Sequence, residues 1–141
     1  MIKGFRHICI LIEDLGGALK FYREILGLKL SKVVTVKGTY PETVLGIKGA
    51  NLTYVKLYGQ NQSKNSQPIL ELHYWHNPKK SLQQKQGHIS FTVKDLDSEY
   101  KRLCKAGVKF ISKPIKAPGG RSKICFCYDP DNNLIELIED L

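Results

Sequence analysis

The chain contains one sequence pattern twice, and this duplication restricts its fold more than any other feature. A strand-like run that starts near His7 leads to a helical stretch and then to Gly27-Leu28-Lys29-Leu30. From His88 the same order returns and leads to Gly107-Val108-Lys109-Phe110. A chain of 141 residues has the size of one ordinary domain. We therefore predict a single domain over residues 1–141, built from two modules at about 1–76 and about 86–141.

Alternating and helical spacing of apolar residues predict the order β-α-β-β-β in each module. The first module is expected to hold strands 5–12, 28–36, 52–58 and 68–75, with a helix over 15–26. The second is expected to hold strands 87–93, 108–112, 122–128 and 133–139, with a helix over 95–106. We expect segment 37–51 to be irregular, 61–67 and 113–120 to be loops, and 129–133 to be a turn. The predicted class is α+β, with a curved sheet around a site and helices outside.

One histidine and one glutamate stand at matching places in the two modules. Glu71 lies in Leu-Glu-Leu and Glu136 in Ile-Glu-Leu, while His7 and His88 begin the first strand of their modules. Successive side chains of a strand point to opposite faces. Since the more apolar set of each strand should pack under the helices, these four side chains are predicted to share the other face.

Two imidazoles and two carboxylates suit one divalent ion of Ni, Zn, Fe, Mn or Co. Such an ion polarises a carbonyl, and a neighbouring carboxylate can move a proton. Taken singly, each of the four residues is also compatible with ordinary packing or a surface salt link. The duplication and the shared face favour a metal site formed by His7, Glu71, His88 and Glu136.

Further polar residues have more than one interpretation. His73 shares the predicted face of Glu71 and is expected to line a pocket or lie at the surface, and His76 to lie at the surface. The loop at Pro118-Gly119-Gly120-Arg121 is compatible with anion binding, with a lid or with an ordinary connection.

Composition excludes several classes of protein. No apolar run is long enough for a membrane span, and the first residues lack a signal-peptide pattern. The 4 cysteines form no Cys-x-x-Cys pair, so we expect reduced thiols and a cytoplasmic protein. The net charge is +9, but the lysines are scattered and no stacking platform accompanies them. This argues against nucleic acid and allows steering of a small anionic substrate.

The duplicated modules, the His-x-x-x-x-x-x-Asp-Leu that opens at His7, the Gly-His-Ile at His88 and the two glutamate motifs together resemble the vicinal oxygen chelate superfamily. That superfamily comprises glyoxalase, bleomycin-resistance and extradiol-dioxygenase proteins, and the resemblance runs from about residue 5 to 139. The His, Glu, His, Glu set is most similar to the glyoxalase I (lactoylglutathione lyase) group. The resemblance implies that these four residues bind the metal. It implies that Glu136, with Glu71 as its counterpart, moves a proton between C1 and C2 of a hemithioacetal or analogue through a metal-bound enediolate.

Two positions depart from the glyoxalase I pattern. Where that family has Arg and Asn for glutathione, this chain has Leu11 and Trp75. A charge-assisted contact would be missing, worth roughly 1.5–3 kcal/mol. The identity of the substrate therefore stays open. The candidates for lining its pocket are Leu11, His73, Trp75 and Arg121.

Three alternatives remain within the resemblance. A ring-cleaving dioxygenase or a fosfomycin-modifying enzyme generally uses two histidines and one carboxylate, which would leave Glu71 surplus. An acyl-CoA epimerase usually has Gln at that position. A non-catalytic drug-binding protein would use a pocket of aromatic residues such as Trp75, Tyr54 and Tyr58. The resemblance also implies a homodimer, in which the site forms within one chain or between two.

Overall fold

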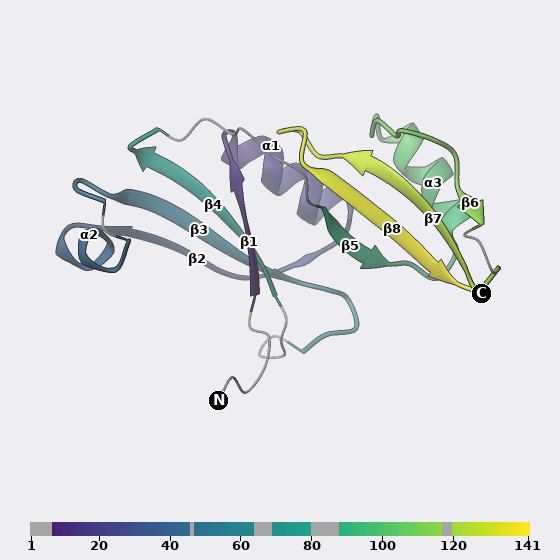
Figure 1. Ribbon diagram of the computed structural model, residues 1–141, viewed down its shortest axis with the longest axis horizontal. Helices are drawn as coiled ribbons and strands as arrows, with labels where there is room; N and C mark the ends of the chain where they lie inside the picture. The colour runs from purple at the N-terminus through teal and green to yellow at the C-terminus, as the bar shows by residue number, and fades with distance from the viewer. Residues whose placement is uncertain (1–6, 46, 64–68, 80–87, 117–119) are drawn as a thin grey trace. The chain divides into compact units, whose positions relative to one another are not determined.

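The computed structural model describes residues 7–45, 47–63, 69–79, 88–116 and 120–141, and it divides the chain into two compact units, Met1–Gln83 and Gln84–Leu141. Each unit contains one of the two predicted modules (Figure 1). Membership of both modules in one domain stays a prediction. None of the helices in the described parts of the chain is long and apolar enough to cross a membrane.

The first unit is a four-stranded mixed sheet with the order β1-β4-β3-β2. Strands β1 and β4 run parallel, and the other neighbours are antiparallel. The elements are β1 (His7–Ile12), α1 (Leu15–Leu19) continued by the π-helical turn η1 (Lys20–Ile25), β2 (Lys29–Lys37), α2 (Thr39–Leu45), β3 (Asn51–Tyr58) and β4 (Ile69–Asn77). Parallel pairing of β1 with β4 puts the first and last strands of the module side by side.

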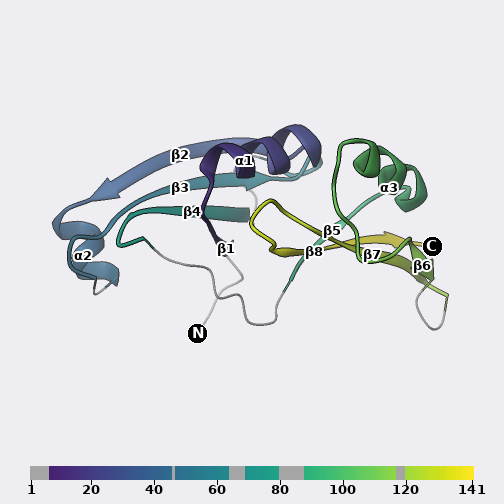
Figure 2. The ribbon, with the colours of Figure 1, turned by 90° about the horizontal axis from the view of Figure 1, so that it is seen from above.

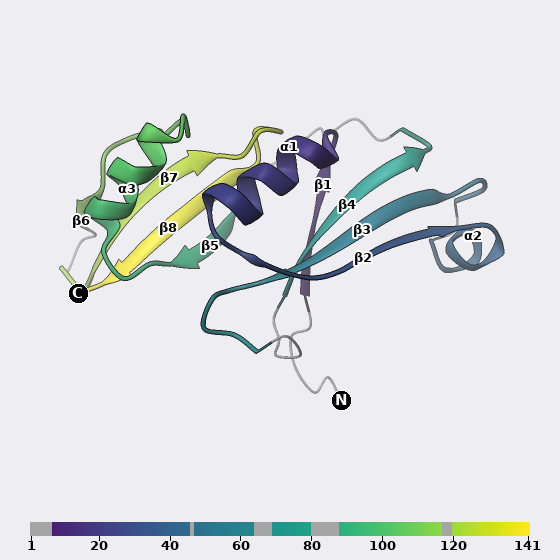
Figure 3. The same ribbon diagram turned by 180° about the vertical axis from the view of Figure 1, so that it is seen from behind.

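Helix α1 and the turn η1 cover one side of this sheet. Figure 1 draws the helix behind β1 and Figure 3 draws it in front, which places it on one face. The helical side chains Ala18, Phe21 and Tyr22 are buried, and so are Leu70 and Leu72 of β4. Gly27 ends the helical stretch with φ 80°, a conformation that costs glycine little. The apolar face of β4 therefore belongs to the core, as predicted.

The second unit repeats this topology. Its sheet has the order β5-β8-β7-β6, with β5 and β8 parallel and the other pairs antiparallel. The elements are β5 (Ile89–Thr92), α3 (Leu96–Lys105), β6 (Ile115–Lys116), β7 (Ser122–Tyr128) and β8 (Leu134–Asp140). Figure 2 shows α3 against one face of this sheet. The predicted α+β class with two β-α-β-β-β modules is confirmed.

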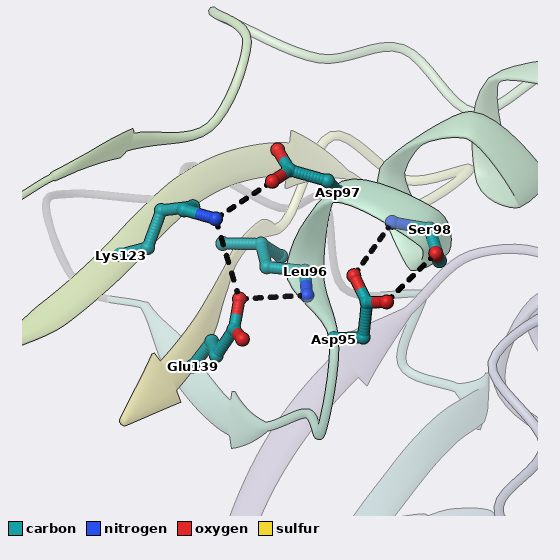
Figure 4. Close-up of polar contacts among 6 residues, drawn as sticks. All are labelled: Asp95, Leu96, Asp97, Ser98, Lys123 and Glu139. Atoms are coloured by element: carbon teal, nitrogen blue, oxygen red, sulfur yellow. Dashed lines mark hydrogen bonds and ion pairs between the residues drawn. The ribbon is translucent and has the colours of Figure 1, made fainter. Parts of the chain in front are cut away.

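The start of α3 is held by a network of polar contacts (Figure 4). The side chain of Asp95 accepts hydrogen bonds from the Ser98 backbone N–H at 3.0 Å and from its hydroxyl at 2.8 Å. Glu139 of β8 accepts a bond from the Leu96 backbone N–H at 3.0 Å, and Lys123 of β7 lies 2.7 Å from Asp97. These contacts satisfy N–H groups that have no partner within the helix and tie α3 to its sheet.

Three predictions about secondary structure are wrong. The segment 37–51, predicted to be irregular, contains α2. This helix follows Gly38, whose φ is 82°, and has Pro41 and Glu42 in its first turn, where both residue types are favoured. A strand was predicted over 108–112, but there the chain makes only an isolated bridge from Phe110 to Cys127.

The edge strand β6 lies instead at Ile115–Lys116, within the segment 113–120 that was predicted to be a loop. The backbone N–H of Ile111 still donates to the carbonyl of Phe126 at 2.9 Å, so this stretch contacts β7 without forming a ladder. The remainder of the two predicted loops at 64–67 and 117–119 lies outside the described residues.

Candidate functional site

The first predicted His/Glu pair is brought together by the parallel pairing of β1 and β4. Cys9 stands opposite Glu71 in the register, and His7 lies two residues before it on the same face. The Nδ1 atom of His7 is 3.6 Å from Oε1 of Glu71. We call these two residues the first half-site. The His7 side chain is 38% exposed, whereas Glu71 is buried.

Two further basic side chains surround the Glu71 carboxylate. Lys56 of β3 stands opposite Glu71 in the antiparallel register and places Nζ 3.2 Å from Oε1. His73, two residues along β4, places Nε2 3.1 Å from Oε2. Burial raises the pKa of Glu71, but the bonds from His73 and Lys56 and the charge of His7 lower it more, so the net shift is downward. The first half-site therefore holds a buried carboxylate in its charged form.

The second pair forms in the same way in the other unit. Nε2 of His88 lies 3.3 Å from Oε2 of Glu136, and we call these residues the second half-site. The His88 side chain is 43% exposed and that of Glu136 is 14% exposed. The His88 ring meets the ring of Phe126 edge-on, with centroids 5.2 Å apart. This carboxylate is thus more open to water than Glu71.

The strand registers show that the two half-sites occupy equivalent positions. Glu71 faces Cys9 across the parallel pair, and Glu136 faces Ser90. Across the antiparallel pair Glu71 faces Lys56, and Glu136 faces Phe126. The duplication therefore repeats the His/carboxylate pair but replaces the neighbouring lysine by an aromatic ring.

The chemistry of each half-site fits a divalent ion. Two ligand atoms about 2.1 Å from one ion and at right angles to each other lie about 3 Å apart. The separations of 3.6 and 3.3 Å between imidazole nitrogen and carboxylate oxygen are only slightly wider. Within either unit, the described residues include no group of three or more His, Cys, Asp or Glu that could hold an ion alone. Each half-site offers one imidazole nitrogen and one carboxylate oxygen.

The substrate-pocket candidates lie in different surroundings. Trp75 is buried in a small apolar cluster at one end of the first sheet, against which Leu11 packs. The other members are Leu52, Ala50, Val36 and Ile47. By strand alternation Leu11 and Trp75 share the sheet face of Glu71 and His73. Arg121 is exposed in the second unit, and its backbone carbonyl accepts a bond from the Leu141 N–H at 2.9 Å.

Lys56 is the neighbour of the first half-site that the sequence analysis did not identify. Alternation along β3 puts Lys56 on the same face as Leu52 and Tyr54, and that signal was available. Its position opposite Glu71 depends on the register between β3 and β4, which the loop between them does not reveal.

Comparison with known proteins agrees with the topology. Residues 4–137 match the model of the Glyoxalase/Bleomycin resistance protein/Dioxygenase superfamily. A protein of Synechocystis sp. named as a probable lactoylglutathione lyase is 34% identical over 136 residues, which cover 94% of this chain and 92% of that protein.

Solved structures with the same fold include two relatives. A glyoxalase family protein from Bacillus cereus has a TM-score of 0.85 at 21% identity, covering 100% of this chain and 96% of its own. The trypanothione-dependent glyoxalase I of Leishmania major has a TM-score of 0.72 at 26% identity, covering 98% of this chain and 87% of its own. At 21% identity, the likeness to the Bacillus cereus protein shows the fold alone.

Proposed function

Since the chain belongs to the Glyoxalase/Bleomycin resistance protein/Dioxygenase superfamily, we propose that it is a metal-dependent lyase or isomerase of the glyoxalase type. The observation that carries this proposal is the His/carboxylate pair at the equivalent position of both modules. The Synechocystis relative named as a probable lactoylglutathione lyase supports the same reaction class.

In this proposal His7, Glu71, His88 and Glu136 hold one divalent ion of Ni, Zn, Fe, Mn or Co. The four residues come from two half-sites, joined either within one chain or between the chains of a homodimer. When bound, the ion supplies Lewis-acid polarisation of a substrate carbonyl. An octahedral ion with four protein ligands keeps two positions for substrate or water.

We assign Glu136 to proton transfer between the two adjacent carbons of the substrate. Glu71, the equivalent glutamate of the first module, is its counterpart in this transfer. His88 is the one basic side chain among the described contacts of Glu136, and the Glu136 side chain is partly exposed. Glu71 is held by Lys56 and His73, which suits a ligand that stays ionised. A carboxylate that moves a proton needs fewer competing cations than a carboxylate that only binds.

The proposed substrate is a hemithioacetal or a related small carbonyl compound. Leu11 and Trp75 pack in an apolar cluster and provide no cation for a glutathione carboxylate. The proposal therefore includes analogues whose thiol part is less polar than glutathione. Residence in the cytoplasm belongs to the same proposal and agrees with Cys125 and Cys127, which are free thiols.

The test begins with elemental analysis of protein purified without a chelator, followed by reconstitution with each of the five metals. We expect one ion per complete set of four ligands and turnover of methylglyoxal hemithioacetals formed with glutathione or with less polar thiols. Failure of all five metals to bind would refute the metal site. Binding without turnover of any hemithioacetal would refute the reaction and keep the metal site.

The Glu71→Gln variant separates the proposal from a dioxygenase-type site with two histidines and one carboxylate. If Glu71 is a ligand, the variant should lose at least about tenfold in metal affinity, because one charged ligand is gone. An unchanged affinity would leave Glu71 out of the ligand set.

A further inference from the structure

Among the described residues, Lys56 and His73 are the basic neighbours of Glu71 that have no counterpart beside Glu136, and Lys56 is the one that reaches Glu71 from a neighbouring strand. The equivalent position next to Glu136 is Phe126, which contacts His88 through its ring edge. Since both modules share topology and register, this difference is a property of the site and not of the fold.

The lysine contacts the oxygen that a metal would need. Its Nζ lies 3.2 Å from Oε1 of Glu71, and the same oxygen is the one that faces Nδ1 of His7 at 3.6 Å. The other oxygen, Oε2, is engaged by His73 at 3.1 Å. An ion between His7 and Glu71 would therefore meet a carboxylate oxygen that already has an ammonium partner.

Burial explains why a cation is needed there. Glu71 is 5% exposed, and its strand, β4, lies between β1 and β3 in the middle of the sheet. A carboxylate removed from water is costly unless a positive group or hydrogen bonds compensate for it. The more exposed Glu136 stands beside Phe126 and has no lysine at the equivalent place.

We propose that Lys56 is an internal cation that holds Glu71 in the metal-free protein and gives up Oε1 of Glu71 when a divalent ion binds. This inference rests on the metal site of the proposed function. It assigns Lys56 as a positioning residue that stabilises the empty site and weakens metal binding. Among the residues that the structure describes, Glu136 has Phe126 and no lysine at the equivalent place, so the second half-site would bind the ion without displacing an ammonium group.

The inference predicts that two properties move in opposite directions. Removal of the ammonium leaves the buried carboxylate without its partner, so the metal-free protein should melt at a lower temperature. The same removal takes away the repulsion between a monovalent and a divalent cation a few ångströms apart, so the metal should bind about tenfold more tightly. If Lys56 had only an ordinary structural role, its removal would lower both the melting temperature of the metal-free protein and its affinity for the metal.

The experiment compares wild type with Lys56→Met and Lys56→Gln. Chelator-stripped protein is melted with circular dichroism as the signal, and Ni²⁺ and Zn²⁺ affinities are measured by competition with a chromophoric chelator. The matched control is Lys32→Met, which removes the same charge from an exposed position opposite Lys56 on the neighbouring strand. If Lys56→Met fails to fold, Lys56→Gln decides, because its amide can still donate to Glu71.

The expected result is a lower melting temperature without metal, tighter metal binding, and a larger rise in melting temperature on metal addition for the Lys56 variants than for Lys32→Met. Unchanged or weaker metal binding in the Lys56 variants would overturn the inference and leave the proposed function intact. A wild-type protein that binds neither metal would overturn both.

Discussion

Replacement of Glu71 by Gln should destabilise the metal-free protein by about 2 kcal/mol at neutral pH. Lys56 Nζ lies 3.2 Å from the carboxylate, and at an effective dielectric constant of 20 the attraction over that distance is about 5 kcal/mol. The cost of taking the carboxylate out of water is several kcal/mol and offsets most of this attraction. A remainder of about 2 kcal/mol agrees with the value of a hydrogen bond to a charged group.

The effect should depend on pH in a defined direction. Burial raises the pKa of Glu71, but His73, Lys56 and His7 together lower it below its ordinary value. The folded state therefore releases a proton at lower pH than the unfolded chain, whose glutamate has a pKa of about 4.3. The stabilisation is fully present above the unfolded pKa and is lost as the pH falls through the folded pKa. The Gln variant should thus approach wild type in acid.

Urea unfolding followed by circular dichroism measures the prediction at pH 7, 5, 4 and 3.5, with a chelator in every buffer. The matched control is Glu136→Gln, because that side chain is more exposed and has no lysine at the equivalent position. The control should lose clearly less stability than Glu71→Gln at pH 7. A gap between Glu71→Gln and wild type of less than about 0.5 kcal/mol at pH 7, or a gap that stays constant down to pH 3.5, would refute the reasoning.

Three further outcomes are expected. Glu136→Gln should lower kcat for hemithioacetal isomerisation by about 10²- to 10⁴-fold in metal-loaded protein, and an unchanged kcat would rule out proton transfer by this residue. Leu72→Ala should cost about 2–5 kcal/mol in urea unfolding because Leu72 is fully buried, whereas Val33→Ala, at 49% exposure, should stay within about 0.5 kcal/mol. Burial raises the pKa of Cys125 to about 11 and that of Cys127 to about 12, so mass spectrometry should find both thiols resistant to iodoacetamide at pH 8 until the protein is unfolded.

The architecture of each module could be predicted from the sequence, because the duplication and the spacing of apolar residues indicate the same order of strands and helix. The strand that contains Glu136 alternates between buried apolar and less buried positions, and around Glu71 apolar and polar residues alternate although Glu71 itself is buried. Strand alternation gave the correct face for Leu70 and Leu72, and hence for Glu71 between them. The helix ends were also predictable, since Gly27 and Gly107 adopt positive φ where each helical stretch stops.

The short elements α2 and β6 could not be predicted, because their stability comes from contacts with residues distant in sequence. Helix α2 is only 7 residues long, and its Glu42 accepts a bond from the Gly49 N–H at 2.8 Å beyond the helix. Strand β6 has two residues, and its position depends on where β7 offers free backbone groups. Local propensity does not determine either element, which is the usual limit for short segments at an edge.

The same distinction applies to the site. Its symmetric part, a histidine and a glutamate in each module, could be found because duplication marks the residues and alternation gives their face. Lys56 could not be found, because it reaches Glu71 only through the register between β3 and β4, while the equivalent register in the other module brings Phe126 to Glu136. The duplication supplies one carboxylate in each module, and the two roles proposed for them require that their surroundings differ. The partner across one pair of strands is a sufficient difference, since the Lys56 ammonium favours the charged form of Glu71, whereas the residue opposite Glu136 is an uncharged ring.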